Sequence, residues 1–276
     1  MNRLRFWFLL PAWVWIVFLF IAPLVIVCAY SLLTRGTYGG VELPWTLESY
    51  ARILDPLYGA ILLRSIAIAA SATALCLVLA FPLALFISRS KRHKNLYLHL
   101  VILPFWTSFL VRTYAWLFLL RDTGLFNTVL TGTGVIRAPL SLLYNDAAVL
   151  IGLVYGFLPF MVLPLFATLE RMDPSLLEAA ADLGARPWAA FFRVIVPLSK
   201  AGIWAGTVLV FVPCLGAYLT PDLLGGGKAV MVGNLVQNQF TTARDWPFGS
   251  AISITLMLLA TMALALFNWR APKEML

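Results

Sequence analysis

Long apolar stretches divide this sequence into regular blocks. Six stretches are each about twenty residues long, enough for an α-helix to cross a hydrocarbon layer roughly 30 Å thick. They lie at Phe6–Leu33, Ser65–Ile87, Leu96–Leu120, Ala147–Leu169, Ala201–Thr220 and Phe248–Asn268. Only the third contains an Asp, Glu, Lys or Arg, namely Arg112. The pattern predicts an all-α integral membrane protein with six transmembrane helices.

The composition supports a surface that faces lipid. Hydrophobic residues make up 62% of the chain and charged residues only 12%, whereas soluble domains carry roughly 45–50% apolar and about 25% charged residues. The apolar excess is too large for a water-soluble core. The net charge of +8 would indicate nucleic acid only if the basic residues formed one patch. They are spread over loops instead, so we exclude nucleic acid as a partner.

Lys and Arg in the loops predict the orientation of the chain. They concentrate on the side that holds residues 89–94, the loop 170–199 and both chain ends, while the opposite loops balance their basic residues with acids. Both termini are therefore expected in the cytoplasm. The first stretch follows Arg3 and Arg5 but is too long for a signal-peptide core, so we expect it to be retained as an anchor.

The cytoplasmic loop 170–199 carries the most informative pattern. Ser175 and Glu178 match a capping box, which predicts a helix start. Gly184 stands where a helix end favours a left-handed residue, and Pro187 suits the first turn of a second helix. The segment is too short and too polar to span, so we expect a helix-turn-helix on the cytoplasmic face.

This loop resembles the EAA loop of type I ABC importer permeases. In that family Glu-Ala-Ala is followed after three residues by Gly, and nine residues later by Ile-x-Leu-Pro. Here Glu178-Ala179-Ala180 precedes Gly184 at that offset, and Val194-Ile195-Val196-Pro197 closes the pattern. The resemblance implies that the short helix docks in a groove of a separate ATPase subunit and transmits its closure. The alternative is an amphipathic helix on the membrane surface that has no protein partner.

The residues expected to couple the chain to the ATPase are those of this motif and its turn. They are Glu178, Ala179, Ala180, Asp182, Gly184, Arg186 and Pro197.

Three further segments narrow the resemblance to the spermidine/putrescine permease branch. Residues 102–116 are similar to the third span of that branch, and residues 221–226 and 244–249 also resemble it. The resemblance covers roughly Ser65 to the C-terminus. It implies an N-terminal helix with a periplasmic loop at 1–58, a permease core at 59–270 with the coupling loop at 170–199, and a cytoplasmic tail at 271–276.

Arg112 and a set of rings and acids are candidates for the substrate pathway. An ionisable residue inside a span is a functional hypothesis, although an arginine can also snorkel to the interface. If Arg112 lines the pathway, we expect Asp222 or Asp122 as its partner. A polyamine would need carboxylates and aromatic faces for its ammonium groups, but rings near span ends also form interfacial belts. The candidates are Arg112, Trp106, Tyr114, Trp116, Tyr155, Tyr218, Asp222 and Asp245.

No enzyme site is predicted in this chain. Residues 225–228 fail as a phosphate-binding loop because Ala229 replaces the required Ser or Thr. The resemblance implies that a partner ATPase binds ATP and Mg and that this chain carries no cofactor. The expected partners are a second homologous permease subunit, two copies of the ATPase, a periplasmic solute-binding protein and the lipid bilayer of the bacterial inner membrane.

We therefore expect the permease subunit of an ATP-driven ABC importer, with a polyamine such as spermidine or putrescine as its substrate. Two alternatives stay open. One is an importer permease for another small solute, such as an amino-acid derivative or an opine-like compound. The other is an ion-coupled secondary transporter, which would favour repeated halves and acids inside the spans. No Asp or Glu lies in any of the six stretches.

Overall fold

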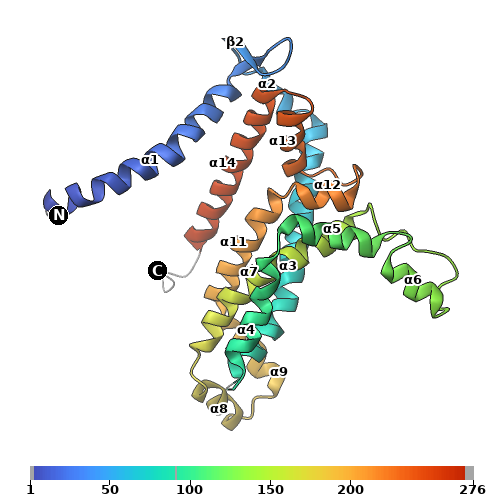
Figure 1. Ribbon diagram of the computed structural model, residues 1–276. Helices are drawn as coiled ribbons and strands as arrows, with labels where there is room; N and C mark the ends of the chain where they lie inside the picture. Colours follow the sequence, from blue (N-terminus) through green and yellow to red (C-terminus); the bar gives the residue numbers. More distant parts are fainter. Residues whose placement is uncertain (1–2, 91, 271–276) are drawn as a thin grey trace. The chain divides into compact units, whose positions relative to one another are not determined.

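The computed structural model describes residues 3–90 and 92–270 and is mostly helical (Figure 1). Lys91 and the predicted tail at 271–276 lie outside the described residues. The described chain falls into two compact units. One contains the residues up to Ala60 together with Leu235–Arg270, and the other contains Ile61–Asn234. The boundary predicted between an N-terminal segment, 1–58, and a permease core, 59–270, stays a prediction.

The first unit is built on two long helices that pack against each other, α1 and α14. A two-stranded antiparallel hairpin follows α1, and Leu33 pairs with Trp45 at its open end. The hairpin and a short helix, α2, both contact α14. The elements of this unit are α1 (Arg3–Ser31), β1 (Leu33–Arg35), β2 (Val41–Trp45), α2 (Glu48–Ile53) and α14 (Trp246–Arg270), with the ends of α3 and α13 that reach into it.

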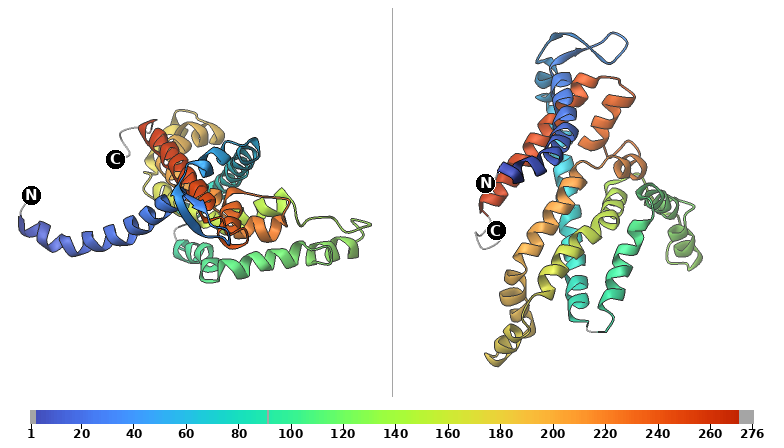
Figure 2. Two further views of the ribbon diagram at one scale, coloured as in Figure 1. Left: turned by 90° about the horizontal axis from the view of Figure 1, so that it is seen from above. Right: turned by 60° about the vertical axis from the view of Figure 1, so that its left-hand side comes forward.

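The second unit has its core along α7 and α11, which lie side by side in both figures (Figures 1 and 2). Its elements are α3 (Pro56–Arg89), α4 (Lys94–Ile102), the 3₁₀ helix η1 (Leu103–Trp106), α5 (Phe109–Leu120), α6 (Leu125–Gly132), α7 (Asp146–Glu170), α8 (Ser175–Asp182), α9 (Pro187–Ala190), the π-helical turn η2 (Phe191–Ile195), α10 (Val196–Leu198), α11 (Lys200–Leu215), α12 (Leu219–Gly225) and α13 (Val232–Thr241).

Two glycines on α11 explain why α7 and α11 pack so closely. A Cβ atom at Gly206 would lie 2.5 Å from Sδ of Met161, and one at Gly202 would lie 2.7 Å from the carbonyl oxygen of Pro164. Small residues four positions apart let two helices approach closely where lipid supplies no hydrophobic drive for association. The buried side chains of Met161, Leu165 and Val210 fill this contact.

Four described helices, in α1, α3, α7 and α14, are long and apolar enough to cross a membrane. Two bent helix pairs would raise the number to six if each pair forms one span. The first joins Lys94–Trp106 to Phe109–Gly132 at 88°, and the second joins Pro187–Leu198 to Lys200–Leu215 at 67°. These pairs correspond to the predicted third and fifth spans, each of which is bent at a break in the helix.

The break in the third predicted span lies at Thr107 and Ser108, whose backbones are extended. Pro104 lacks an N–H group and cannot donate to the preceding turn. The Thr107 hydroxyl donates to the Pro104 carbonyl at 2.7 Å, a local bond that competes with the helical ladder. The fifth predicted span also ends early, because α11 stops at Leu215 rather than at Thr220.

Candidate functional site

The α8–α9 corner, residues 173–190, contains most of the predicted coupling residues. An Asp-Pro pair begins α8. The Asp173 carboxylate accepts a hydrogen bond from the Ser175 N–H at 2.9 Å, and Pro174 occupies the first turn, where its missing N–H has no cost. The Glu178 N–H donates to the Pro174 carbonyl at 3.3 Å. The predicted Ser175–Glu178 capping box is therefore wrong, because Asp173 caps the helix two residues earlier.

The hydrogen bond from the Ser175 N–H lowers the pKa of the Asp173 carboxyl below its ordinary value. A lowered pKa means that the folded corner favours the ionised carboxylate. The cap is therefore intact above the ordinary carboxyl range, and it is lost as the pH falls through the lowered pKa.

The end of α8 is closed by a left-handed glycine. Gly184 has φ +77°, its N–H donates to the Ala181 carbonyl at 2.8 Å, and the Ala185 N–H donates to the Ala180 carbonyl at 3.0 Å. These two bonds form a Schellman motif, so the predicted helix end at Gly184 is confirmed. A Cβ atom there would meet nothing within 4 Å. The constraint on this residue is therefore its backbone conformation and not lack of space.

Both short helices of the corner are exposed. None of the residues of α8 is buried, and the Leu183 and Trp188 side chains are 89% and 74% exposed. These two side chains offer apolar area that another subunit could cover. The predicted coupling residues lie on or beside this surface: Glu178, Ala179, Ala180 and Asp182 in α8, Gly184 in the turn, Arg186 before α9, and Pro197 in α10.

An aromatic cluster ties this corner to the long helices. The Phe191 ring lies 5.2 Å from the Phe81 ring on α3 and 5.0 Å from Phe192, and Trp188 stacks on Phe192 at 6.3 Å. Figures 1 and 2 show α8 and α9 at the tip beyond α7 and α11. A displacement of the corner would therefore reach α3 directly. This cluster was not predicted from the sequence, although the adjacent Phe191 and Phe192 were a signal for it.

Arg112 lies in the first turn of α5, directly after the break. Its guanidinium carbon is 4.8 Å from the centroid of the Phe105 ring and 5.6 Å from that of Phe109. Its Nε and Nη1 atoms are buried, with no hydrogen-bond acceptor among the described residues. The ion pairs of the described chain are Arg52–Asp245, Arg64–Asp146 and Lys94–Glu170. The expected pairing of Arg112 with Asp222 or Asp122 is therefore wrong, because aromatic faces occupy that position.

The structure brings some of the other pathway candidates together. The Trp116 ring on α5 lies 5.5 Å from the Tyr155 ring on α7, edge to face. Tyr218 and Asp222 stand at the start of α12, which packs against both α5 and α7. Tyr114 on α5 and Tyr218 are partly exposed, Asp222 is exposed, and Trp106 at the break is 80% exposed.

Asp245 has a different environment, in the first unit. Its buried carboxylate accepts hydrogen bonds from Arg52 Nη1 at 2.8 Å and from the Phe248 N–H at 3.2 Å. The Arg52 guanidinium also lies 4.0 Å above the Phe248 ring. Burial lowers the pKa of Arg52, but Asp245 and Tyr58 together raise it by more, so the pKa lies above its ordinary value. Asp245 thus caps α14 and binds α2 to it.

Two further phenylalanines on α7, Phe157 and Phe160, support the two rings beside Arg112, and none of the four was predicted from the sequence. The Phe105 ring lies 5.0 Å from Phe160, and Phe109 lies 6.1 Å from Phe157. Gly156 on α7 makes room for this contact, because a Cβ atom there would lie 2.8 Å from Cε2 of Phe109. In an apolar stretch such rings were indistinguishable from lipid-facing residues.

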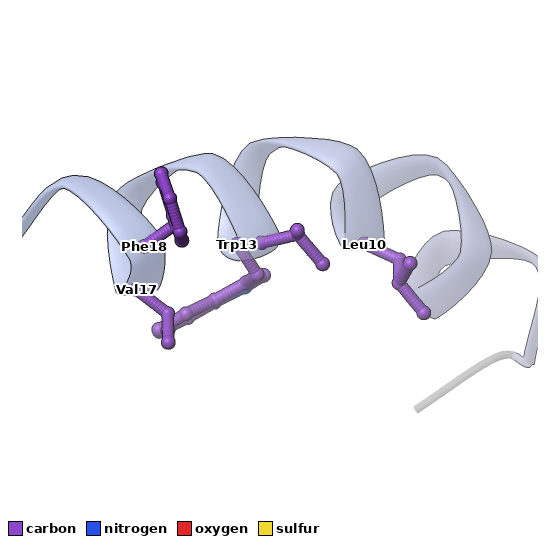
Figure 3. A pocket seen from close by; sticks show the side chains of 5 residues that line it. Leu10, Trp13, Val17 and Phe18 are labelled. Carbon is purple, nitrogen blue, oxygen red and sulfur yellow. The ribbon is translucent and has the colours of Figure 1, made fainter. Parts of the chain in front are cut away.

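A shallow groove on α1 has a wholly apolar lining. Leu10, Trp13, Val14, Val17 and Phe18 form it along one helix face (Figure 3). The groove offers no hydrogen-bonding group to a polar solute, so it is not a candidate for the substrate pathway.

Comparison with known proteins identifies relatives over almost the whole chain. The family described as binding-protein-dependent transport system inner membrane component matches residues 77–273. The spermidine/putrescine transport system permease protein PotB of Haemophilus influenzae is 42% identical over 263 residues, which cover 95% of this chain and 91% of that protein. PotB of Escherichia coli is 43% identical over 260 residues, 94% of each chain.

A chain in the crystal structure of a bacterial alginate ABC transporter, in complex with an alginate pentasaccharide-bound periplasmic protein, has the same fold. It matches with a TM-score of 0.71 and 17% identity and covers 99% of this chain and 95% of its own length.

Proposed function

Because this chain belongs to the family of binding-protein-dependent transport system inner membrane components, we propose that it imports spermidine or putrescine. It is the permease subunit of a type I ABC importer and resides in the inner membrane. The observation that carries the polyamine assignment is the 42–43% identity to spermidine/putrescine permeases over 94–95% of the chain. Identity of this extent includes the helices that would line the pathway as well as the coupling loop.

The proposed topology has six spans, with each bent helix pair counted as one, and both termini in the cytoplasm. The distribution of Lys and Arg supports this orientation. It places the α8–α9 corner in the cytoplasm and the β-hairpin of the first unit in the periplasm. The hairpin side would then meet the periplasmic binding protein that delivers the solute.

In the proposed mechanism the α8–α9 corner docks in a groove of an ATPase subunit. Its exposed Leu183 and Trp188 side chains supply apolar contact area, and Glu178, Asp182 and Arg186 surround them with charge. ATP and Mg bind to the ATPase, whose closure moves the corner. The Phe191–Phe81 contact would transmit that movement to α3. Since one chain supplies one corner, two ATPase copies require a second, homologous permease subunit.

Uptake by the reconstituted complex tests the substrate assignment. Proteoliposomes that contain both permeases and the ATPase would receive binding protein loaded with labelled spermidine, with ATP on the opposite side. We expect ATP-dependent accumulation that excess unlabelled spermidine or putrescine suppresses and that an amino acid does not. Accumulation of another solute class with no uptake of either polyamine would contradict the proposal.

Cysteine labelling tests the topology. In a cysteine-free background, cysteines replacing Tyr38 and Lys228 should react with an impermeant thiol reagent added from outside, and one replacing Asn95 should not. All three positions are exposed in the structure. The reversed labelling pattern would remove the α8–α9 corner from the cytoplasm.

A further inference from the structure

Two aromatic rings at the break in the third predicted span already hold a cation. The guanidinium of Arg112 lies 4.8 Å from the Phe105 centroid and 5.6 Å from the Phe109 centroid. Phe105 and Phe109 are held in turn by Phe160 and Phe157 on α7. This geometry is that of a cation–π site, in which the negative faces of the rings attract a positive group.

Arg112 is not anchored in this site by an acid. Its Nε and Nη1 atoms are buried and find no acceptor among the described residues. A carboxylate would hold the guanidinium through strong, often bidentate hydrogen bonds. Without one, the aromatic faces are the groups that hold the guanidinium, and another cation that reaches the rings can compete for them.

The site also lies where a pathway is expected. The helix pair bends by 88° here, and the extended backbone at Thr107 and Ser108 separates η1 from α5. Non-helical backbone at membrane depth is tolerated where it is covered by protein or lines a water-filled cavity, and discontinuous helices often form solute sites in transporters. Trp106 is exposed at the same break.

We propose that Phe105 and Phe109 form a transient ammonium-binding site, and that Arg112 occupies this site until an ammonium group of the solute displaces it. The inference rests on the proposed polyamine function and adds the residues that select for positive charge. The guanidinium covers the ring faces when no solute is present. It also makes solute binding weak and reversible, which suits a site that must release its ligand towards the cytoplasm.

Equilibrium binding of radiolabelled spermidine to the assembled complex tests this proposal. The complete permease–ATPase complex in lipid nanodiscs, without binding protein and without ATP, would be titrated with spermidine. Arg112→Met keeps a long, unbranched side chain but removes the competing charge. We expect it to bind spermidine about tenfold more tightly than the wild type, which corresponds to ~1.4 kcal/mol.

Replacement of both rings identifies where the spermidine binds. Adding Phe105→Leu and Phe109→Leu to Arg112→Met keeps the apolar volume but removes the ring faces, and we expect the gain in affinity to disappear. Arg112→Lys keeps a competing cation, so its affinity should stay near that of the wild type. The proposal is overturned if Arg112→Met binds no more tightly than the wild type, or if the gain survives without the rings.

Arg121 provides a matched control directly after the C-terminal end of the same helix. Its guanidinium carbon lies 5.9 Å from the Phe118 ring, but the residue is exposed. We expect Arg121→Met to leave spermidine affinity unchanged. If Arg121→Met raises the affinity for spermidine as much as Arg112→Met does, the effect comes from the lower net charge alone and the proposal is overturned.

Transport by a variant that keeps Arg112 gives a second, independent measurement. In proteoliposomes with loaded binding protein, Phe105→Leu/Phe109→Leu should import several-fold less spermidine per ATP while the ATPase stays stimulated; an unchanged ratio overturns the ammonium site.

Wild-type uptake tests the proposed function separately. A wild-type complex that imports spermidine while Arg112→Met gains no affinity keeps the function and refutes the site. Tighter, ring-dependent binding in a complex that imports no polyamine keeps the site and refutes the function.

Discussion

The α8–α9 corner and the α13–α14 corner (residues 242–245) both turn the chain through a left-handed residue, but one turn is exposed and the other is covered. Gly184 has φ +77° and a Cβ position with nothing within 4 Å. Arg244 has φ +50°, and the next residue, Asp245, is buried against Arg52. The hairpin covers the second turn as well, because the Gly40 N–H donates to the Arg244 carbonyl at 3.0 Å.

The comparison shows that a left-handed turn does not by itself reveal the role of a corner. In the α13–α14 corner the Asp245 carboxylate and the Arg244 carbonyl are both hydrogen-bonded within the chain, so the turn fixes α14 and the hairpin together. In the α8–α9 corner, α8 and Arg186 present exposed charges, and Leu183 and Trp188 present exposed apolar side chains, which are free to meet another subunit. The first arrangement predicts effects on stability, and the second predicts effects on coupling.

Gly184→Glu should have the largest effect. A non-glycine residue in the left-handed conformation costs roughly 1–2 kcal/mol, and the added carboxylate would stand on the docking surface. We expect wild-type amounts in the membrane, because no spanning helix is touched, but little transport and no stimulation of the ATPase by loaded binding protein. Uptake and ATP hydrolysis in proteoliposomes measure both.

Gly184→Asn is the matched control, because Asn adopts the left-handed conformation more readily than other residues with a Cβ atom. It should retain most of the transport. If Gly184→Glu transports at the wild-type rate with ATPase activity still coupled, the α8–α9 corner is not the lever.

Asp245→Ala should act on stability instead. It removes the cap of α14, worth about 1 kcal/mol, and the charge-assisted bond to the half-exposed Arg52. Together we expect a loss of about 2–3 kcal/mol, measured as a lower unfolding midpoint in detergent. Asp222→Ala, at an exposed acid, should change stability by less than about 0.5 kcal/mol. If Asp245→Ala protein has normal stability but does not transport, Asp245 belongs to the substrate pathway and its structural role is contradicted.

Arg244→Asn should give the smallest effect, and of opposite sign. Asn keeps the Cβ atom that packs beside Gly39, and it tolerates a positive φ better than Arg does. We expect a gain of a few tenths to about 1 kcal/mol in the same unfolding assay, with transport unchanged. A loss of stability would mean that the Arg244 side chain holds the corner through contacts of its own.

The sequence predicted those features that depend on neighbouring residues. The apolar stretches, the helix end at Gly184 and the start of a helix near Pro187 follow from periodicity and backbone preference, and each is present. The capping box failed because two start signals compete within one turn. Asp173-Pro174 precedes Ser175-x-x-Glu178, and the earlier signal satisfies the first N–H groups.

Features that depend on distant residues could not be predicted in the same way. Arg52 and Asp245 are 193 positions apart, so no local pattern shows that the acid is already used. A carboxylate was expected beside Arg112 because an acid is the usual partner of a buried guanidinium. Its actual neighbours are Phe105, which lies across the break, and Phe109, which lies three positions earlier on α5. The break interrupts the helical spacing between Phe105 and Arg112, so only the Phe109 contact follows from local spacing.

Alkylation of a cysteine at position 183 tests the account most directly. Leu183 is 89% exposed at the tip of the α8–α9 corner, and Leu54, near the α13–α14 corner within the first unit, is 84% exposed. In a cysteine-free background, Leu183→Cys should react rapidly in permease without ATPase and at least tenfold more slowly in the assembled complex. Leu54→Cys should react at the same rate in both. Equal rates for Leu183→Cys with and without the ATPase would contradict docking at this corner.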